Sequence, residues 1–394
     1  MTPIAYVVET PFTQRDYERF GVKHLNDQGF RVQVWDCSSF LSNQSEASET
    51  AELFDADDWR RFSSLYEFAN AVDQAGDQTI FLLLTGYGLQ YRPLYHALTR
   101  AASIYGTEQF NALPTIARRR YLFTQLRKVP RYPNKIARGV FMYLPFRNWG
   151  IRPPNFLLAG GTSSITSAGL IGRETQIIWA HSLDYDIYLR EKSTPVLKRP
   201  HEYAVFVDQY LPFHPDYAHF GLANPIAPER YYPKLVALFQ SLEHALGIEV
   251  VIAAHPRSHY ETQPDCFCGR DVIKGQSSTL IRNARIALAH HSTSVNFANL
   301  YHKPISFIDM SFDADNGESL SIAQLAAEFG KPPIHVDRLH AIDWKSELDV
   351  DESAYAGYRE RYIKKAGSPE KPSWQIFADY VKSLIHDRDY SASH

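Results

Sequence analysis

Two short polar motifs in the second half of the chain have the residue types of a phosphate-binding site. Their residues are His255, Pro256 and Arg257 in one motif and Ser292, Thr293 and Ser294 in the other. An imidazole or a guanidinium can donate hydrogen bonds to a phosphate, and serine or threonine can open a helix whose unbonded N–H groups attract an anion. The motifs therefore predict a nucleotide-phosphate site with His255 as its leading ligand and Arg257 assisting. A capping or core role is the alternative for each motif.

Three carboxylates are candidates for the base of a transfer reaction. Glu9 ends the first apolar run of the chain, and Asp184 and Asp186 follow the apolar run 176–179. An acceptor hydroxyl must lose its proton as it attacks, and a carboxylate positioned across a cleft can accept that proton. Each of these carboxylates could instead be structural. Asp208, which ends a later apolar run, would lie at a hinge or contact the donor.

Metal-ligating residues occur in this sequence without the spacing of a metal site. Asp184 and Asp186 have the letters of an Asp-x-Asp motif, but their place after a predicted strand does not settle their role. Cys266 and Cys268 lie downstream of His255, although their spacing is not that of a zinc knuckle. We therefore expect no essential metal. Helix dipoles, histidine and arginine would then stabilise the leaving nucleotide.

The elements that must position these residues alternate between strands and helices. Apolar runs predict strands at 4–8, 31–35, 79–84, 155–159, 176–179, 203–207, 249–254, 285–289 and 305–308. Residue periodicity predicts helices at 13–26, 57–75, 231–246, 294–301 and 374–385. Continuous apolar runs are typical of parallel strands that are buried on both faces. We therefore predict an α/β fold with two Rossmann-like domains, whose ligands bind beyond the carboxyl ends of the strands.

Two loops rich in glycine also end predicted strands, at residues 85–88 and 160–164. They are candidates for one wall of a site, and tight turns or helix caps are the alternative.

The length of the chain predicts two domains. Its 394 residues exceed what one hydrophobic core usually organises. The polar segment 191–200 contains two prolines and is the best linker. We expect an N-terminal acceptor-side domain at 1–195, a C-terminal nucleotide-sugar domain at 203–370, and a C-terminal helix and tail at 371–394. The two domains would face a cleft.

Composition argues against several classes of protein. The formal net charge of −3 gives no field for nucleic acid, although lysine and arginine are dense between Arg118 and Arg138. The longest apolar stretch, 80–84, is far shorter than the roughly 20 residues of a membrane span. The first residues have no signal-peptide pattern, and three cysteines fit a reducing compartment. We expect a cytoplasmic protein that binds no nucleic acid, with peripheral inner-membrane contact at 118–138 if its acceptor is lipid-linked.

The stretch from Tyr203 to Asp309 resembles the C-terminal domain of GT-B glycosyltransferases that build bacterial surface polysaccharides. In the sialyltransferase and capsular Kdo-transferase groups, His-Pro and Ser/Thr motifs contact the CMP of the donor, and residues 255–256 and 292–294 are similar to these motifs. The resemblance implies metal-independent transfer of a sugar, such as a nonulosonic or Kdo-like acid from CMP, to a surface polysaccharide, O-antigen or capsule acceptor. The nucleotide-sugar would be a co-substrate, with no other cofactor.

Two features limit what the resemblance implies. The motif at 292–294 is also similar to those of CDP-glycerol glycerophosphotransferases and of UDP-sugar enzymes, which leaves the donor base open. The N-terminal half lacks the Asp/Glu-Asp/Glu-Gly motif of the sialyltransferases, which leaves the catalytic base open.

Other functions fit some of the same residues. A polysaccharide pyruvyltransferase would use His255, Arg257 and Arg282 to bind phosphoenolpyruvate. A carbohydrate-binding protein would hold a glycan without turnover. A nucleotide-sugar epimerase would need several carboxylates near the sugar, a set that the sequence does not place. A nucleotide alone should stabilise a nucleotide-sugar enzyme and not a pyruvyltransferase.

Overall fold

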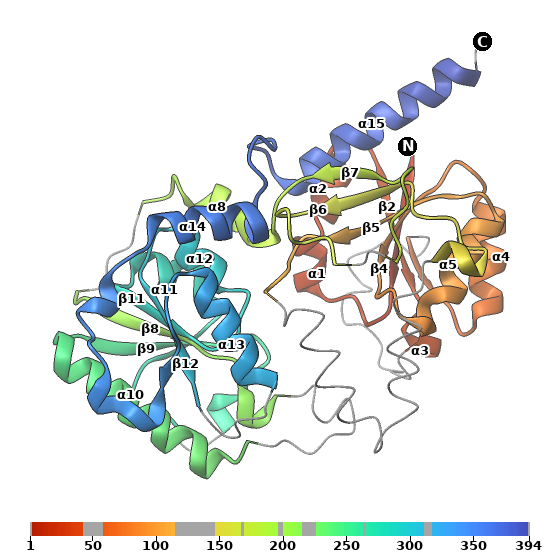
Figure 1. Ribbon diagram of the computed structural model, residues 1–394. Helices are drawn as coiled ribbons and strands as arrows, with labels where there is room; N and C mark the ends of the chain where they lie inside the picture. The colour runs from red at the N-terminus through yellow and green to blue at the C-terminus, as the bar shows by residue number, and fades with distance from the viewer. Residues whose placement is uncertain are drawn as a thin grey trace. The chain divides into compact units, whose positions relative to one another are not determined.

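The computed structural model describes two compact α/β units (Figure 1). The described residues are 2–41, 58–114, 146–166, 169–195, 200–214, 226–262, 265–310 and 317–392. The first unit comprises the described residues of Met1–Ala112, Arg119–Leu183 and Lys364–His394, and the second comprises those of Leu113–Arg118 and Asp184–Ile363. Among the described helices, none is long and apolar enough to cross a membrane.

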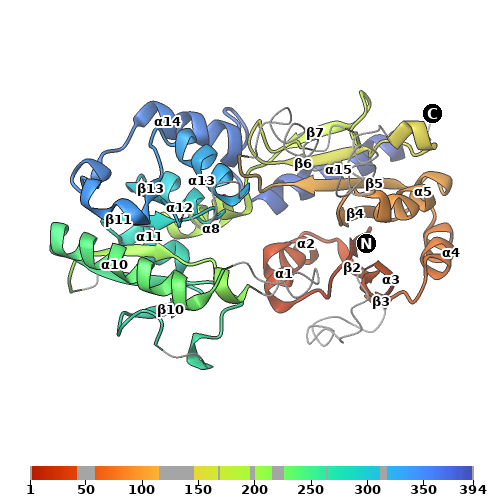
Figure 2. The same cartoon turned by 60° about the horizontal axis from the view of Figure 1, so that its bottom comes forward.

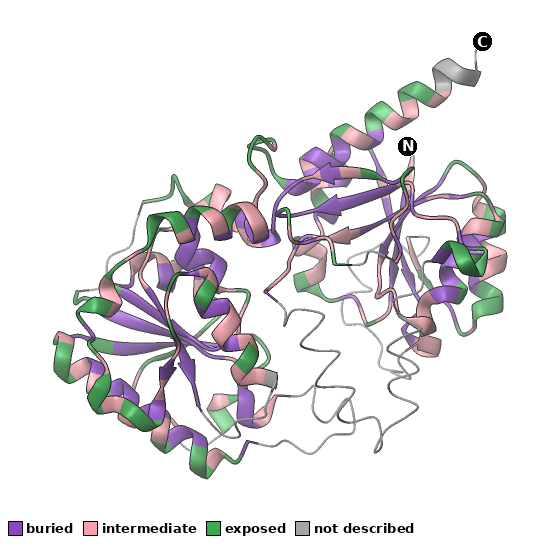
Figure 3. Ribbon diagram, in the orientation of Figure 1, coloured by how far each residue is buried: buried purple, intermediate pink, exposed green. Residues whose placement is uncertain are grey.

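The first unit contains a parallel sheet of seven described strands in the order β3-β2-β1-β4-β5-β6-β7. The strands are β1 (Pro3–Val8), β2 (Arg31–Asp36), β3 (Trp59–Arg61), β4 (Ile80–Leu84), β5 (Ile104–Gln109), β6 (Phe156–Ala159) and β7 (Gln176–Trp179). Apart from one partly buried residue at an end of each, the central strands β1 and β4 consist of buried apolar residues, as a sheet covered on both faces requires (Figure 3).

Helices cover both faces of this sheet. They are α1 (Gln14–Arg19), α2 (Val22–Asp27), α3 (Ser38–Leu41), α4 (Leu65–Ala75), α5 (Arg92–Arg100) and α15 (Ser373–Ala392), with 3₁₀ turns η2 (Leu89–Tyr91) and η3 (Phe146–Trp149). The helices α2 and α15 bury their apolar side chains against one face, and α4 and α5 bury theirs against the other. Two hydrophobic cores therefore hold the sheet between them.

Two predicted helices of this unit are shorter than the sequence indicated. The predicted helix 13–26 is split into α1 and α2 because Gly21, with φ of 62°, takes the left-handed conformation. The predicted helix 57–75 begins only at Leu65, after the N-cap Ser64, because Trp59–Arg61 pairs with β2 as an edge strand.

The second unit contains a parallel sheet of six described strands in the order β10-β9-β8-β11-β12-β13. The strands are β8 (Tyr203–Val207), β9 (Glu249–Ala254), β10 (Val272–Lys274), β11 (Ile286–Ala289), β12 (Ile305–Asp309) and β13 (Ile334–His335). The α-helices are α8 (Leu183–Glu191), α10 (Pro228–Leu246), α11 (Ser277–Asn283), α12 (Val295–Leu300), α13 (Gly317–Glu328) and α14 (Glu352–Tyr358). The short turns are η4 (Leu211–Phe213), η5 (Tyr260–Thr262), η6 (Val336–Ala341), η7 (Ser346–Leu348) and the π-helical η8 (Arg359–Ile363).

Helices also cover both faces of the second sheet. In both ribbon views α10 lies on one side of the sheet, and α13 and α14 lie on the other (Figure 2). Apolar residues of α10, such as Tyr231 and Phe239, share one core with β8 and β9. The prediction of two Rossmann-like α/β domains is therefore confirmed, since both sheets also have the strand order of that fold.

The two units divide the chain at a different place from the predicted boundary at 195–203. Helix α8 belongs to the second unit from Asp184 onward, and the Glu191 carboxylate at its end accepts from Ser278 and Tyr301 of that unit. Helix α15, predicted as a separate tail, belongs to the first unit because Trp374 and Phe377 are buried in its core. The predicted linker 191–200 therefore follows the first helix of the second unit.

Candidate functional site

The strand order of the second sheet reverses between β8 and β11. Strands β9 and β10 continue from β8 on one side, and β12 and β13 continue from β11 on the other. In open α/β sheets this reversal leaves a crevice beyond the carboxyl ends of the strands, which is where ligands bind. The loops after β8, β9 and β11 all reach this edge. The two polar motifs of the sequence, at 255–257 and 292–294, belong to two of these loops.

The first motif forms a tight turn after β9. The N–H and the hydroxyl of Ser258 both donate to the carbonyl of His255, at 2.9 and 2.7 Å, and Lys274 of β10 donates to the carbonyl of Ser258 at 2.6 Å. Ser258 is buried, whereas Pro256 and Arg257 are exposed on the outside of the turn. The bonds of Ser258 and Lys274 thus hold the backbone of the turn, and the side chains of Pro256 and Arg257 face solvent.

The hydrogen bonds of His255 indicate which ring nitrogen carries the proton. The backbone N–H of Arg257 donates to Nδ1 of His255 at 3.2 Å. Because Nδ1 accepts, the neutral ring carries its proton on Nε2. The ring of His214 lies 5.2 Å from that of His255, centroid to centroid.

Asp208 is a buried carboxylate directly below this turn. Its Oδ2 accepts from the hydroxyl of Tyr260 at 2.9 Å and from the N–H of His255 at 3.4 Å, and its Oδ1 accepts from the N–H of Tyr210 at 2.9 Å. Burial raises the pKa of Asp208 to about 6, although the hydrogen bonds to the carboxylate act in the opposite sense. The sequence indicated a hinge or donor role for Asp208, and the structure gives it bonds to the loops after β8 and β9.

Gln209 joins the loop after β8 to the loop after β11. Its Oε1 accepts from the N–H of His291 at 2.9 Å, and its Nε2 donates to the carbonyl of the same residue at 2.5 Å. The side-chain amide therefore bonds to both backbone groups of one residue across the strand reversal. Sequence analysis did not single out this glutamine.

The second motif opens α12 in a different way from the expected helix cap. The N–H of Ser294 donates to Oγ of Ser292 at 3.3 Å, and the next three N–H groups donate to the carbonyls of Ser292, Thr293 and Ser294. Ser294 makes no side-chain cap, and α12 has only six residues. The first turn of the helix therefore satisfies its own donors, and of the two residues before Ser294, Ser292 is half-buried and Thr293 is exposed.

His290 of the same loop is structural. It is fully buried, with Nδ1 2.7 Å from the carbonyl of Ile308 and Nε2 2.8 Å from the hydroxyl of Tyr231. Burial lowers its pKa to about 4, so the ring is neutral and bridges β12 to α10. Burial also lowers the pKa of His291.

Residues that sequence analysis missed lie on the same edge of the second sheet. His214 forms a second His-Pro dipeptide with the residue that follows it, and this repeat of the motif at 255–256 is a signal that the sequence contained. Glu318 stands in the first turn of α13, and burial raises its pKa. Asp309 ends β12 and accepts from the hydroxyl of Ser319 at 2.8 Å. No motif marked these two acids.

The candidate base Glu9 lies at the strand reversal of the first sheet, between β1 and β4. Its Oε1 accepts from the N–H of Gly86 at 3.1 Å, and its side chain also bonds to the hydroxyl of Tyr91. Burial and Glu9 together raise the pKa of Tyr91 to about 12. A further acid on this edge, Glu108 near the end of β5, accepts from the N–H of Phe110, and burial raises its pKa.

The other two candidate bases lie on α8 in the second unit. Oδ2 of Asp184 accepts from Nδ2 of Asn296 at 2.8 Å, and Oδ1 of that asparagine accepts from the hydroxyl of Tyr358. Asp184 thus helps to hold the start of α12, next to the motif at 292–294. Asp186 is half-buried two residues further along the helix.

Two further sequence features have structural explanations. Gly160 of the loop 160–164 lies so close to the carbonyl oxygen of Phe110 that an added Cβ would approach it to 2.3 Å. Arg282 donates to the carbonyls of Glu191 and Thr194, so it caps the end of α8. Within the described ranges, no three His, Cys, Asp or Glu side chains are grouped to hold a metal ion.

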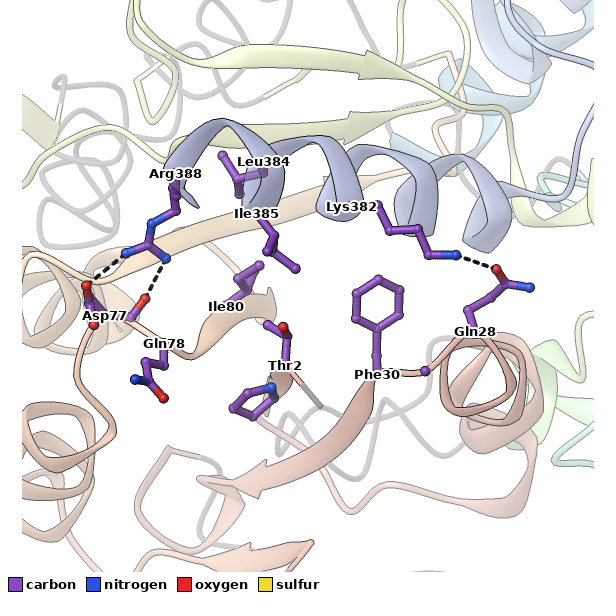
Figure 4. A pocket seen from close by; sticks show the side chains of 12 residues that line it. Thr2, Gln28, Phe30, Asp77, Gln78, Ile80, Lys382, Leu384, Ile385 and Arg388 are labelled. Atoms are coloured by element: carbon purple, nitrogen blue, oxygen red, sulfur yellow. Dashed lines mark hydrogen bonds and ion pairs between the residues drawn. The ribbon is translucent and has the colours of Figure 1, made fainter. Parts of the chain in front are cut away.

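A cavity of about 670 Å³ lies at the opposite, amino edge of the first sheet (Figure 4). Ile80 and Phe30 face α15 across it, and Lys382 and Arg388 of that helix bond to Gln28 and Asp77 at its rim. None of the predicted site residues lines it. The basic segment Arg118–Arg138, which the sequence connected with membrane contact, lies outside the described residues.

Comparison with known proteins leaves the family of this chain unassigned. No protein-family model and no curated protein matches the sequence. The structure is similar to CalG4, the calicheamicin glycosyltransferase, with 13% identity over 98% of both chains and a TM-score of 0.49. It is similar to S. aureus MnaA in its co-structure with UDP, with 11% identity over 98% of this chain and 97% of that chain and a TM-score of 0.49. It is also similar to Acinetobacter baumannii MurG, with 8% identity over 97% of this chain and 100% of that chain and a TM-score of 0.45. Likenesses of this size carry no argument about activity.

Proposed function

We propose that the chain is a glycosyltransferase of the GT-B type that binds a nucleotide-sugar at the β8/β11 edge of its second unit. The observation that carries the proposal is the gathering of the His255 turn, the Asp208–Gln209 dipeptide and the motif at 292–294 around one strand reversal. Such an edge is the usual place for a nucleotide in this fold.

In this proposal the phosphates bind to side chains as well as to backbone. His255 would donate from Nε2, Arg257 would supply a positive charge, and Ser292 and Thr293 would donate from their hydroxyls. Pro256 would stiffen the turn, and Ser294 would begin the helix behind it. Glu318 could accept hydrogen bonds from the ribose hydroxyls, because a carboxylate offers two acceptor oxygens to a diol.

Transfer to an acceptor hydroxyl needs a base, and Glu9 is the first choice. It stands at the strand reversal of its own sheet, where a ligand of the first unit would bind. Asp184 and Asp186 are the second choice, because Asp184 already accepts a bond from Asn296. No metal and no cofactor besides the nucleotide-sugar would take part.

The donor and the acceptor follow from the resemblance of the sequence. The preferred donor is a CMP-sugar, such as a nonulosonic or Kdo-like acid. The preferred acceptor is a surface polysaccharide, an O-antigen or a capsule glycan, free or lipid-linked. If the acceptor is lipid-linked, the basic segment 118–138 would make the contact with the inner membrane.

The first experiment is a thermal-shift panel of CMP, CDP, UDP, GDP and phosphoenolpyruvate. One nucleotide should raise the melting temperature, since a ligand at 100 times its Kd adds about 2.7 kcal/mol to the free energy of unfolding. The substitution His255→Ala should lower the affinity for that nucleotide by about tenfold or more, because a hydrogen bond to a charged group contributes about 1.5–3 kcal/mol.

The matched control for this panel is His259→Ala. His259 is exposed in the same loop and pairs with Glu261 rather than facing the turn. The control should respond to the nucleotide like the wild type. A flat response of the folded wild type to all four nucleotides would contradict the proposal, and stabilisation by phosphoenolpyruvate alone would favour a pyruvyltransferase.

A further inference from the structure

Asp208 and Gln209 lie next to each other and bond to opposite sides of the proposed phosphate site. Asp208 bonds to the N–H of His255 in the loop after β9. Gln209 bonds to both backbone groups of His291 in the loop after β11. One dipeptide is therefore connected to each of the two loops that contain the proposed phosphate ligands.

The backbone at this dipeptide is held in an unusual conformation. Tyr210, the next residue, has φ of 55° and ψ of 32°, the left-handed region that costs a residue with a side chain about 1–2 kcal/mol. The carboxylate of Asp208 accepts from the N–H of Tyr210, and the buried ring of Tyr210 packs on Tyr260 with centroids 5.1 Å apart. This backbone persists because surrounding bonds hold it, and Asp208 makes three of them.

We propose that Asp208 and Gln209 are positioning residues that set the spacing between the His255 turn and the His291–Thr293 turn. The proposal rests on the proposed function, because it concerns the binding of the nucleotide phosphates at that same edge. Neither side chain would touch the nucleotide. Each would act through a backbone group of the loop that does.

The test separates phosphate binding from general stability. The affinities of CMP and cytidine, UDP and uridine, and GDP and guanosine are measured by titration on the full chain. The ratio of nucleotide to nucleoside affinity reports what the phosphates contribute. The variants are Gln209→Met, which keeps the length of the side chain but neither donates nor accepts, and Asp208→Asn. Asp343→Asn is the control, because Asp343 also accepts two backbone N–H groups of its own loop.

We expect both site variants to lower the ratio by about tenfold, with nucleoside affinity unchanged and the control like the wild type. If burial makes Asp208→Asn unfold, the half-buried Gln209→Met decides the matter. An unchanged ratio in a folded Gln209→Met variant overturns the inference while the proposed function stands. An equal loss for nucleoside and nucleotide also overturns it, because that result indicates only a structural role. A wild type that binds no nucleotide overturns the proposed function, and the inference with it.

Discussion

Glu9 combines two properties that suit a base for an acceptor hydroxyl. It follows β1 at the strand reversal of its sheet, and among the described residues its carboxylate bonds to the N–H of Gly86 and to the hydroxyl of Tyr91. A carboxylate has about four acceptor positions, so it can accept another hydrogen bond from a substrate. Asp184 differs, because Asn296 and Tyr358 continue its hydrogen bond into the buried start of α12.

We predict that Glu9→Gln separates binding from chemistry. The amide keeps the shape of the side chain but cannot accept a proton, so turnover should fall by about 10²–10⁴-fold, the usual contribution of a general base. Stabilisation by the nucleotide should stay at the wild-type level. The measurement is the rate of sugar transfer or of donor hydrolysis, monitored through the release of free nucleotide. If Asp184→Asn instead shows a loss of this size while Glu9→Gln keeps normal activity, the role of general base would belong to Asp184 on α8.

Asp208 predicts a particular pH dependence of stability. Its pKa is about 6 in the folded chain and near 3.8 in the unfolded chain, so between these values only the folded state binds the proton. Stability from this group therefore rises as the pH falls from 7 to 4, by about 2 kcal/mol. His290 acts in the opposite sense, since burial lowers its pKa to about 4.

The measurement compares urea unfolding of the wild type and Asp208→Asn at several pH values. The difference between the two chains cancels the contribution of His290. Between pH 7 and pH 4, we expect the stability of the wild type to increase relative to that of the variant by about 2 kcal/mol. A constant difference across this range would contradict the raised pKa of Asp208.

At the scale of the elements, α15 is docked on the first unit through Trp374. The buried indole packs near Tyr6 and Phe20, and its Nε1 donates to the carbonyl of Arg19 at 2.8 Å. The ring lies against the junction of α1 and α2, where a Cβ on Gly21 would come within 2.2 Å of its Cγ. The break between these helices therefore makes room for α15.

We predict that Gly21→Ala destabilises the first unit by more than the cost of placing alanine in the left-handed backbone conformation. Alanine at a left-handed residue costs about 1–2 kcal/mol, and the contact with Trp374 adds to this. Gly247→Ala is the control, because Gly247 has nearly the same φ and ψ, 66° and 28°, and its added Cβ meets no atom within 4 Å. Denaturant unfolding should give the larger loss for Gly21→Ala, and equal losses would indicate that the indole moves aside.

At the scale of the whole molecule, the two units contain the same hydrogen-bond arrangement. In each unit a polar side chain after the first strand bonds to the backbone after the fourth: Glu9 to Gly86 in one, and Gln209 to His291 in the other. Both bonds cross the strand reversal. The acid suits the side on which we propose proton transfer, whereas the neutral amide suits the side on which we propose a negatively charged phosphate, because it adds no repulsion.

The whole chain also returns to its first unit after completing the second. His181, before α8, is fully buried and lies 3.0 Å from the hydroxyl of Ser373 and 2.7 Å from the carbonyl of Lys371. These bonds join the two places where the chain leaves and re-enters the first unit. The C-terminal helix is for this reason part of a core and not a tail.

The sequence by itself determined most of the strands and the edge on which the candidate site residues lie. Runs such as 80–84 are apolar throughout because both faces of a parallel strand are buried, and this requirement is visible without a structure. The polar motifs after β9 and β11 lie at one edge, since the parallel strands of one sheet all end at the same edge. Strand β5, in which Gly106 is followed by three polar residues, lacked that signal and was missed.

Only the tertiary structure decided which side chains act together. Gln209 and His291 are far apart in sequence, as are Asp184 and Asn296, and nothing local relates either pair. The order of the strands and the docking of helices such as α15 bring these groups within bonding distance. A motif shows which kinds of group a residue can bond to. Its actual partner depends on which distant elements pack into the same core, and this is determined by packing over the whole unit.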